Sequence, residues 1–175
     1  MAKYCTYIIL LFSLFSCKKQ EGISDTQGKT FVKYFGSFGF DKSTNMQQTD
    51  DEGFIIAGTI SSLTNGKEAA IIKTDKYGNE QWTKIYGDSL DNFANNILSI
   101  DDGYLVLGTT TDSLLTTNMW LFKINSSGNV IWSKQYGSES NEQGISLVKS
   151  NVDGYILAGT KSNITTAGEE TDFYF

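Results

Sequence analysis

Three segments of the chain share one pattern: GFIIAGT at residues 53–59, GYLVLGT at 103–109 and GYILAGT at 154–160. In each, a glycine is followed by an aromatic residue and an apolar run that closes on Gly-Thr, and the three glycines are 50 and 51 residues apart. A short continuous apolar run bounded by turn residues is typical of a strand buried on both faces. The pattern therefore predicts one buried strand in each copy of a fifty-residue repeat.

Other matches at the same spacing extend the repeat. They are WTKIYG (82–87) with WSKQYG (132–137), Lys73 with Lys123, Gly78-Asn79 with Gly128-Asn129, and a degenerate early copy FVKYFG (31–36). The second copy holds four strand-length segments separated by turn signals, at 93–100, 104–110, 119–124 and 130–136. No helical periodicity follows Cys17, so the sequence predicts an all-β chain.

Four antiparallel strands in about 40–50 residues form one blade of a β-propeller. A single blade cannot bury both of its faces, so neighbouring blades must supply the core. The lysine that recurs in the fourth strand (Lys33, Lys84, Lys134) fits an outer edge protected from pairing with other chains. We expect blade 1 at about 43–87, blade 2 at about 93–137, an incomplete blade 3 at about 144–175, and an isolated outer strand at 30–36.

The chain resembles bacterial lipoproteins with SBBP-type β-propeller repeats. The resemblance rests on the W-x-K-x-Y-G end, the D-G-[YF] turn, the apolar strand that closes on Gly-Thr, and a Lys-x-x-x-x-Gly-Asn hairpin. It covers residues 30–175 and implies a propeller fold and an extracytoplasmic location. It implies no particular activity, because such repeats serve as a scaffold for many purposes.

Closed propellers contain about four to eight blades, and about three are expected here. We therefore expect an incomplete propeller and a partial chain. The alternative is that residues 30–35 pair beside residues 173–175, so that three blades close on themselves or assemble with another copy.

The N-terminal residues 1–16 have the form of a secretory signal, with Lys3 before a short apolar run. The sequence LFSC at 14–17 resembles the bacterial lipobox, which implies that Cys17 becomes the lipidated first residue of the mature chain. Residues 17–29 then form a flexible tether. In similar lipoproteins, lysines after the cysteine accompany transfer to the outer membrane, and Lys18-Lys19 fit that pattern. We expect a lipid-anchored protein of the bacterial envelope.

The composition excludes several classes of chemistry. The 175 residues include no histidine and no arginine, and the formal net charge is −6. Without histidine there is no Ser–His or Cys–His pair and no imidazole metal ligand. An acidic chain without a basic stripe does not suit nucleic acid. No cofactor is expected.

Two sets of oxygen-bearing residues recur with the repeat. The first set follows the fourth-strand glycines and could face a ligand: Asp41, Asp91 and Asn141. The second set lies in the turns before the repeated glycines and gives a weak calcium alternative: Asp51, Asp101 and Asp153. Calcium requires six or more oxygens from one loop, and aspartate is also a common turn former.

The sequence therefore favours a non-catalytic envelope lipoprotein whose propeller scaffold binds a protein or a glycan. Loops after the second strands, at 61–68, 111–118 and 161–171, differ between copies and are where specificity is expected. The alternatives are a carboxylate-dependent hydrolase or lyase, a quinone-type propeller enzyme, and a truncated fragment without function.

Overall fold

The computed structural model describes residues 31–36, 39–62, 66–138, 140–165 and 168–174. These residues form eleven strands and no helix, which confirms the prediction of an all-β chain. Accordingly, this part of the chain has no helix able to span a membrane. The predicted signal (1–16), Cys17 and the tether (17–29) lie outside the described residues.

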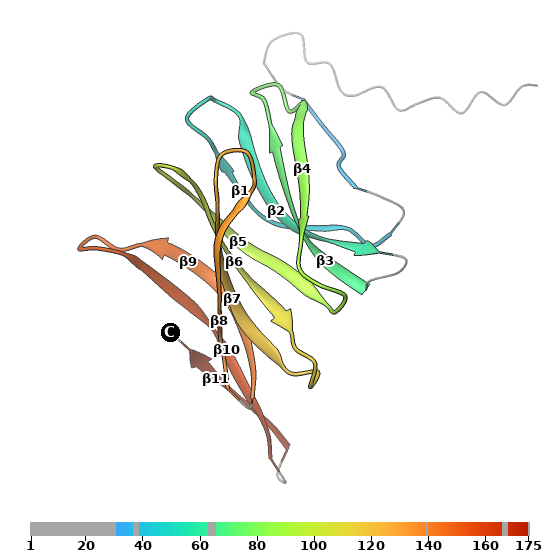
Figure 1. Ribbon diagram of the computed structural model, residues 1–175, viewed down its shortest axis with the longest axis vertical. Helices are drawn as coiled ribbons and strands as arrows, with labels where there is room; N and C mark the ends of the chain where they lie inside the picture. The colour runs from blue at the N-terminus through green and yellow to red at the C-terminus, as the bar shows by residue number, and fades with distance from the viewer. Residues whose placement is uncertain (1–30, 37–38, 63–65, 139, 166–167, 175) are drawn as a thin grey trace, which may run out of the picture. The chain divides into compact units, whose positions relative to one another are not determined.

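The strands form three antiparallel sheets that follow one another along the chain (Figure 1). The first sheet contains β1 (Lys42–Gln48), β2 (Phe54–Ser62), β3 (Gly66–Thr74) and β4 (Glu80–Tyr86). The second contains β5 (Asn92–Ile100), β6 (Gly103–Thr111), β7 (Thr117–Ile124) and β8 (Val130–Tyr136). The third contains β9 (Asn141–Lys149), β10 (Tyr155–Thr165) and β11 (Gly168–Tyr174). Within each sheet, every strand pairs with its neighbour in sequence, and the sheets do not close into a ring.

The sequence predicts an isolated outer strand at 30–36, and the described residues 31–36 are assigned to no strand. The strand that this segment resembles, β4, pairs with β3, the third strand of its own sheet. The segment 31–36 precedes β1 and has no such third strand before it in the described chain.

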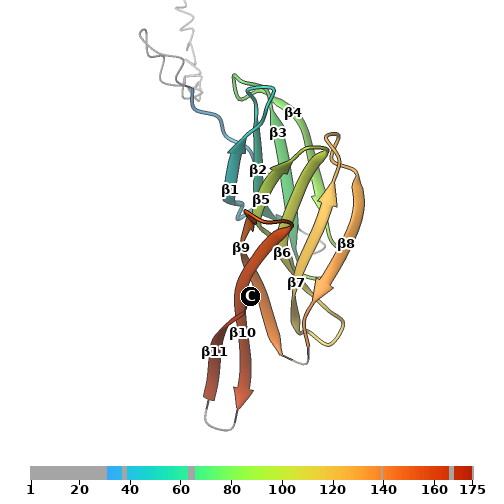
Figure 2. The ribbon, with the colours of Figure 1, turned by 90° about the vertical axis from the view of Figure 1, so that its left-hand side faces the viewer.

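Alternating side chains of the second sheet pack against different neighbours. Tyr104 and Val106 belong to a core shared with the first sheet, whereas Leu105 and Leu107 belong to a core shared with the third. Because successive residues of a strand point to opposite faces, residues 104–107 of β6 are buried on both faces, as the continuous run at 103–109 predicts. The first strands of the three sheets lie side by side, with β1 next to β5 and β5 next to β9 (Figure 2).

The turns before the repeated glycines do not all use the glycine in the same way. Gly154 has a positive φ (77°), as such turns require. In the first turn, Glu52 takes the left-handed conformation instead (φ 63°). Gly53 is required there because a Cβ would lie 2.2 Å from the carbonyl oxygen of Thr74. The same sequence signal thus reports a left-handed turn in one copy and a close backbone approach in another.

Candidate functional site

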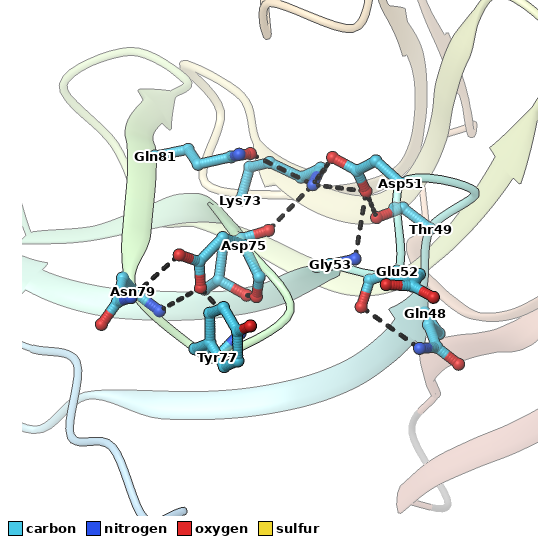
Figure 3. Close-up of polar contacts among 11 residues, drawn as sticks. Gln48, Thr49, Asp51, Glu52, Gly53, Lys73, Asp75, Tyr77, Asn79 and Gln81 are labelled. Atoms are coloured by element: carbon cyan, nitrogen blue, oxygen red, sulfur yellow. Dashed lines mark hydrogen bonds and ion pairs between the residues drawn. The ribbon is translucent and has the colours of Figure 1, made fainter. Parts of the chain in front are cut away.

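The densest polar cluster with a perturbed pKa surrounds Lys73 at one end of the first sheet (Figure 3). The buried Lys73 Nζ donates hydrogen bonds to both carboxylate oxygens of Asp51 (2.7 and 3.0 Å), to the Thr74 carbonyl (2.8 Å) and to Gln81 Oε1 (3.2 Å). Hydrogen bonds from Lys73 and from the Thr49 hydroxyl hold the pKa of Asp51 at about 2, below its ordinary value of 3.8. Asp51 is therefore ionised at neutral pH and cannot serve as a proton donor.

The second sheet repeats this ion pair. Lys123, the counterpart of Lys73, donates to Asp102 Oδ2 at 2.7 Å, and the pair lowers the pKa of Asp102. In both sheets the lysine of the third strand thus anchors the turn between the first two strands. Only the lysines are at equivalent positions, because Asp102 is the counterpart of Glu52 and Asp101 is the counterpart of Asp51. A lysine–carboxylate pair that recurs in two sheets is better explained by the architecture of the repeated sheet than by chemistry performed once.

The three residues of the calcium alternative, Asp51, Asp101 and Asp153, lie in three different turns, one in each sheet. Asp51 faces the Lys73 ammonium, and Asp153 accepts a hydrogen bond from the N–H of Gly154 (2.8 Å). Within the described ranges, no group of three or more His, Cys, Asp or Glu side chains is gathered as metal ligands would be. The structure brings no two of these three aspartates into one loop.

Asp91 and Asn141 connect neighbouring sheets. Asp91, just before β5, accepts a hydrogen bond on Oδ1 from the backbone N–H of Lys67 in β3 (2.9 Å). Asn141, at the start of β9, accepts the equivalent bond from the N–H of Thr117 in β7 (3.0 Å). These hydrogen bonds explain why an oxygen-bearing side chain recurs at this position, because each one joins its sheet to the preceding sheet.

Asp41 stands at the same position before the first sheet, where the described chain has no preceding sheet. Its Oδ1 accepts a hydrogen bond from the N–H of Ser61 in β2, within its own sheet (3.2 Å). All three residues that the sequence suggested as ligand-facing therefore bind backbone amides, and they lie at the starts of three different sheets.

A second set of hydrogen bonds between neighbouring sheets comes from residues that the sequence analysis does not single out. Thr44 and Asn95 are the extra residues of β-bulges in the inner strands β1 and β5. Thr44 Oγ1 donates to the Ala94 carbonyl, and Asn95 Nδ2 donates to the Gly144 carbonyl, both at 2.6 Å. A bulge redirects a side chain out of the regular alternation, and here it directs the polar group to the inner strand of the next sheet.

The repeated W-x-K-x-Y segment of β4 forms a cradle for a turn of the second sheet. A Cβ on Gly128 would lie within about 3 Å of Trp82, Lys84 and Tyr86, so only glycine fits. Tyr86 Oη donates to the Gly128 carbonyl (2.7 Å), and Lys84 Nζ donates to Asn129 Oδ1 (2.5 Å). Burial raises the pKa of Tyr86, so its hydroxyl remains a donor at neutral pH. We call Trp82, Lys84 and Tyr86 the β4 cradle.

Glu142, in β9, is a buried carboxylate that the sequence did not single out. It accepts hydrogen bonds from the Ser138 hydroxyl (2.6 Å) and lies 3.5 Å from Lys161 Nζ. Its counterpart in the second sheet is the buried Asn92, which accepts a hydrogen bond from Thr110 (2.7 Å). An amide–hydroxyl pair in one copy is thus replaced by an ion pair in the next. Because equivalent positions hold a buried polar pair in both sheets, Glu142 has a structural role in the third sheet.

The loop between β6 and β7 is ordered by Asp112, a residue that does not recur in the other two copies of the repeat. Asp112 Oδ1 accepts hydrogen bonds from the N–H groups of Leu114 and Thr116 (2.9 and 3.1 Å), which closes the loop on itself. Leu115 adopts a left-handed backbone conformation (φ 64°), which is uncommon for leucine. Leu114 and Leu115 are 81% and 73% exposed. We call residues 112–116 the leucine loop.

No protein-family model matches the chain, and no curated protein matches it.

Proposed function

We propose that this chain is a non-catalytic, lipid-anchored protein of the bacterial envelope whose β-propeller blades present a binding loop to a protein or glycan. The observation that carries the proposal is a contrast between two groups of residues: those at repeated positions and those of the unrepeated leucine loop. Side chains at repeated positions bind other parts of the scaffold, as Asp91, Asn141 and the β4 cradle do. The leucine loop, which is not repeated, exposes apolar side chains on an ordered backbone.

The propeller interpretation is supported by the way that the sheets meet. Successive sheets pack face to face through equivalent residues, and their first strands lie together. That is the relation between neighbouring blades of a propeller. The bulge bonds of Thr44 and Asn95 repeat at this inner edge, as a regular rotation from one sheet to the next requires.

The binding role is supported by the stiffness of the leucine loop. Holding Leu115 in the left-handed region costs free energy, of the order of 1–3 kcal/mol for such a residue, and Asp112 offsets that cost with several hydrogen bonds. A preorganised apolar loop binds a partner with less loss of conformational entropy than a mobile one. Two adjacent exposed leucines favour an apolar patch on a protein over a glycan.

The binding proposal is tested by probing the acyl-free mature chain against arrays of glycans and envelope proteins. Leu114→Ser is the test variant, and Tyr77→Ser, which changes another exposed apolar side chain on a different turn, is the matched control. We expect Leu114→Ser alone to abolish binding. Binding that survives both changes would reject the leucine loop, and a folded chain that binds nothing would reject the binding function.

The anchoring proposal is tested separately by mass spectrometry of the chain isolated from a bacterial membrane fraction. We expect an N-terminal peptide that begins with a diacylated Cys17. An unmodified Cys17 would reject the anchor, while the fold would be unaffected.

A further inference from the structure

The tripeptide Asp-Gly-Tyr occurs twice in the chain, in turns of different length. Residues 102–104 follow β5, and residues 153–155 follow β9. An aspartate that precedes glycine can react with the backbone, because glycine has no side chain to hinder its amide nitrogen. The two copies hold the same three residues, so a difference in their reactivity in the folded chain reports the structure around them.

The reaction is a rearrangement of the backbone that needs only water. The glycine nitrogen loses its proton and attacks Cγ of the aspartic acid, the N–Cγ bond forms, the bond from Cγ to the hydroxyl oxygen breaks, and water leaves. The product is a five-membered succinimide, and a water molecule then adds to one of its two carbonyl carbons. Cleavage between the nitrogen and the original backbone carbonyl carbon gives isoaspartate, whereas cleavage of the N–Cγ bond restores aspartate.

The turn between β9 and β10 brings the reacting groups together. The N–H of Gly154 donates to Asp153 Oδ1 at 2.8 Å, so the attacking nitrogen lies next to the carboxyl group. Both residues are exposed, and Gly154 precedes Tyr155, the first paired residue of β10. The peptide group between Asp153 and Gly154 can therefore rotate towards the carboxyl group without breaking a strand pair.

The turn between β5 and β6 holds the same two groups in place. Gly103 is the first residue of β6 and pairs with Ile100, so its amide belongs to the pair that closes the hairpin. Asp102 Oδ2 accepts a hydrogen bond from Lys123 Nζ (2.7 Å), which lowers the pKa of Asp102 and keeps its carboxyl group ionised at neutral pH. A carboxylate is attacked more slowly than a carboxylic acid, because its carbon carries more electron density. Both contacts therefore oppose succinimide formation at Asp102.

The two turns differ in length by one residue. Residues 150–154 connect the paired parts of β9 and β10, and the corresponding residues between β5 and β6 are 100–103, which is one residue fewer. The longer turn leaves Gly154 outside the strand ladder, whereas the shorter turn places Gly103 in it. Turn length thus decides whether the glycine amide is free to reorient.

We propose that Asp153–Gly154 is a site of spontaneous isoaspartate formation, and that the shorter turn protects Asp102–Gly103. Isoaspartate adds one methylene group to the backbone of the turn and leaves the net charge unchanged. The strand β9 begins at Asn141, which bonds to the backbone of Thr117 beside the leucine loop, and the reactive turn follows its other end. The inference therefore does not depend on the proposed binding function.

The test follows isoaspartate at both sites while the full chain is incubated at neutral pH. A protein isoaspartate methyltransferase with a labelled methyl donor marks isoaspartate and not aspartate, and peptide mass spectrometry locates the label. In the folded chain, we expect isoaspartate to form at Asp153 at least about tenfold faster than at Asp102, which corresponds to about 1.4 kcal/mol in activation free energy. In urea, where both turns are lost, the two sites should react at similar rates, because the tripeptides are the same.

Deletion of Val152 tests the turn without changing the reacting residues. Val152 is 96% exposed, and its removal gives the turn the length of the one between β5 and β6. We expect the rate at Asp153 to fall towards that at Asp102, whereas Val152→Ser, which keeps the turn length, should leave the rate unchanged. Asp153→Glu should remove the label from this peptide. Equal rates at the two aspartates in the folded chain, or a difference that persists in urea, would overturn the proposal, and so would an unchanged rate at Asp153 in a folded chain without Val152.

Discussion

Removing one hydroxyl from the β4 cradle should destabilise the whole chain, although the same change in the next repeat should not. Tyr86→Phe deletes the buried hydroxyl that donates to the Gly128 carbonyl at 2.7 Å and leaves that carbonyl without this donor. An unsatisfied buried polar group costs about 1–3 kcal/mol. The ring contact with Phe122, at 5.2 Å between centroids, is retained. We therefore expect the free energy of unfolding to fall by about 1–2 kcal/mol.

The matched control is Tyr136→Phe at the equivalent position of β8. Tyr136 is exposed, and an exposed substitution of this kind changes stability by less than about 0.5 kcal/mol. Urea unfolding measures the free energies, and thermal unfolding should show a lower Tm for Tyr86→Phe alone, by about 2–4 °C per kcal/mol in a chain of this size. Equal effects of the two substitutions, or none for Tyr86→Phe, would refute the view that the cradle joins successive sheets.

Three further outcomes follow from the structure. Leu107→Ala leaves a cavity between the second and third sheets and should lower the free energy of unfolding, measured with urea, by about 2–5 kcal/mol. Leu114→Ala in the leucine loop should leave that free energy almost unchanged. Similar changes for the two variants would contradict the assignment of Leu107 to the core. Asn95→Ala removes the hydrogen bond to the Gly144 carbonyl and should lower the free energy of unfolding by about 1 kcal/mol. Asn95→Thr, which copies Thr44, should recover part of that free energy. An unchanged free energy for Asn95→Ala would show that this hydrogen bond does not join the two sheets. The pKa of Asp51 is lowered from 3.8 to about 2, so its contribution is complete above pH 4 and disappears as the pH falls towards 2. Solvent screening keeps that contribution small, because Asp51 is half exposed. Asp51→Asn should flatten this part of the stability profile against pH, and an unchanged profile would contradict the ion pair.

The sheets could be predicted from the sequence because the signals are local. Period-two alternation, continuous apolar runs such as 103–109 and Gly-Asn turns each depend on a few adjacent residues, and the fifty-residue spacing shows that the same unit recurs. The local signal at 31–36 is an exception. Its pattern is that of β4, but the structure assigns it to no strand, because strand formation also depends on a neighbouring strand that a local pattern does not specify.

The roles of the repeated polar residues could not be predicted because their partners lie in the next repeat. Lys84 was interpreted as protection of an exposed edge, whereas its ammonium binds Asn129 of the following sheet. Asp91 and Asn141 were candidates for ligand contact, whereas they bind backbone amides of the preceding sheet. These bonds depend on how one sheet is displaced relative to the next, which no local pattern encodes. The exposed leucines of residues 112–116 likewise became informative only once Asp112 was seen to order the loop.

Proton–proton contacts in solution test the central claim, that consecutive repeats pack as whole sheets through matched residues, most directly. In one NOESY spectrum of the folded chain, the rings of Tyr86 and Phe122 should show a cross-peak for the first junction. The Leu107 methyl group and the Gly144 α-protons should show one for the second junction, because a Cβ on Gly144 would lie 2.7 Å from Leu107 Cδ1. Both cross-peaks are predicted together. Strand pairing within each sheet without either cross-peak would show that the sheets form but do not pack, and would contradict the account.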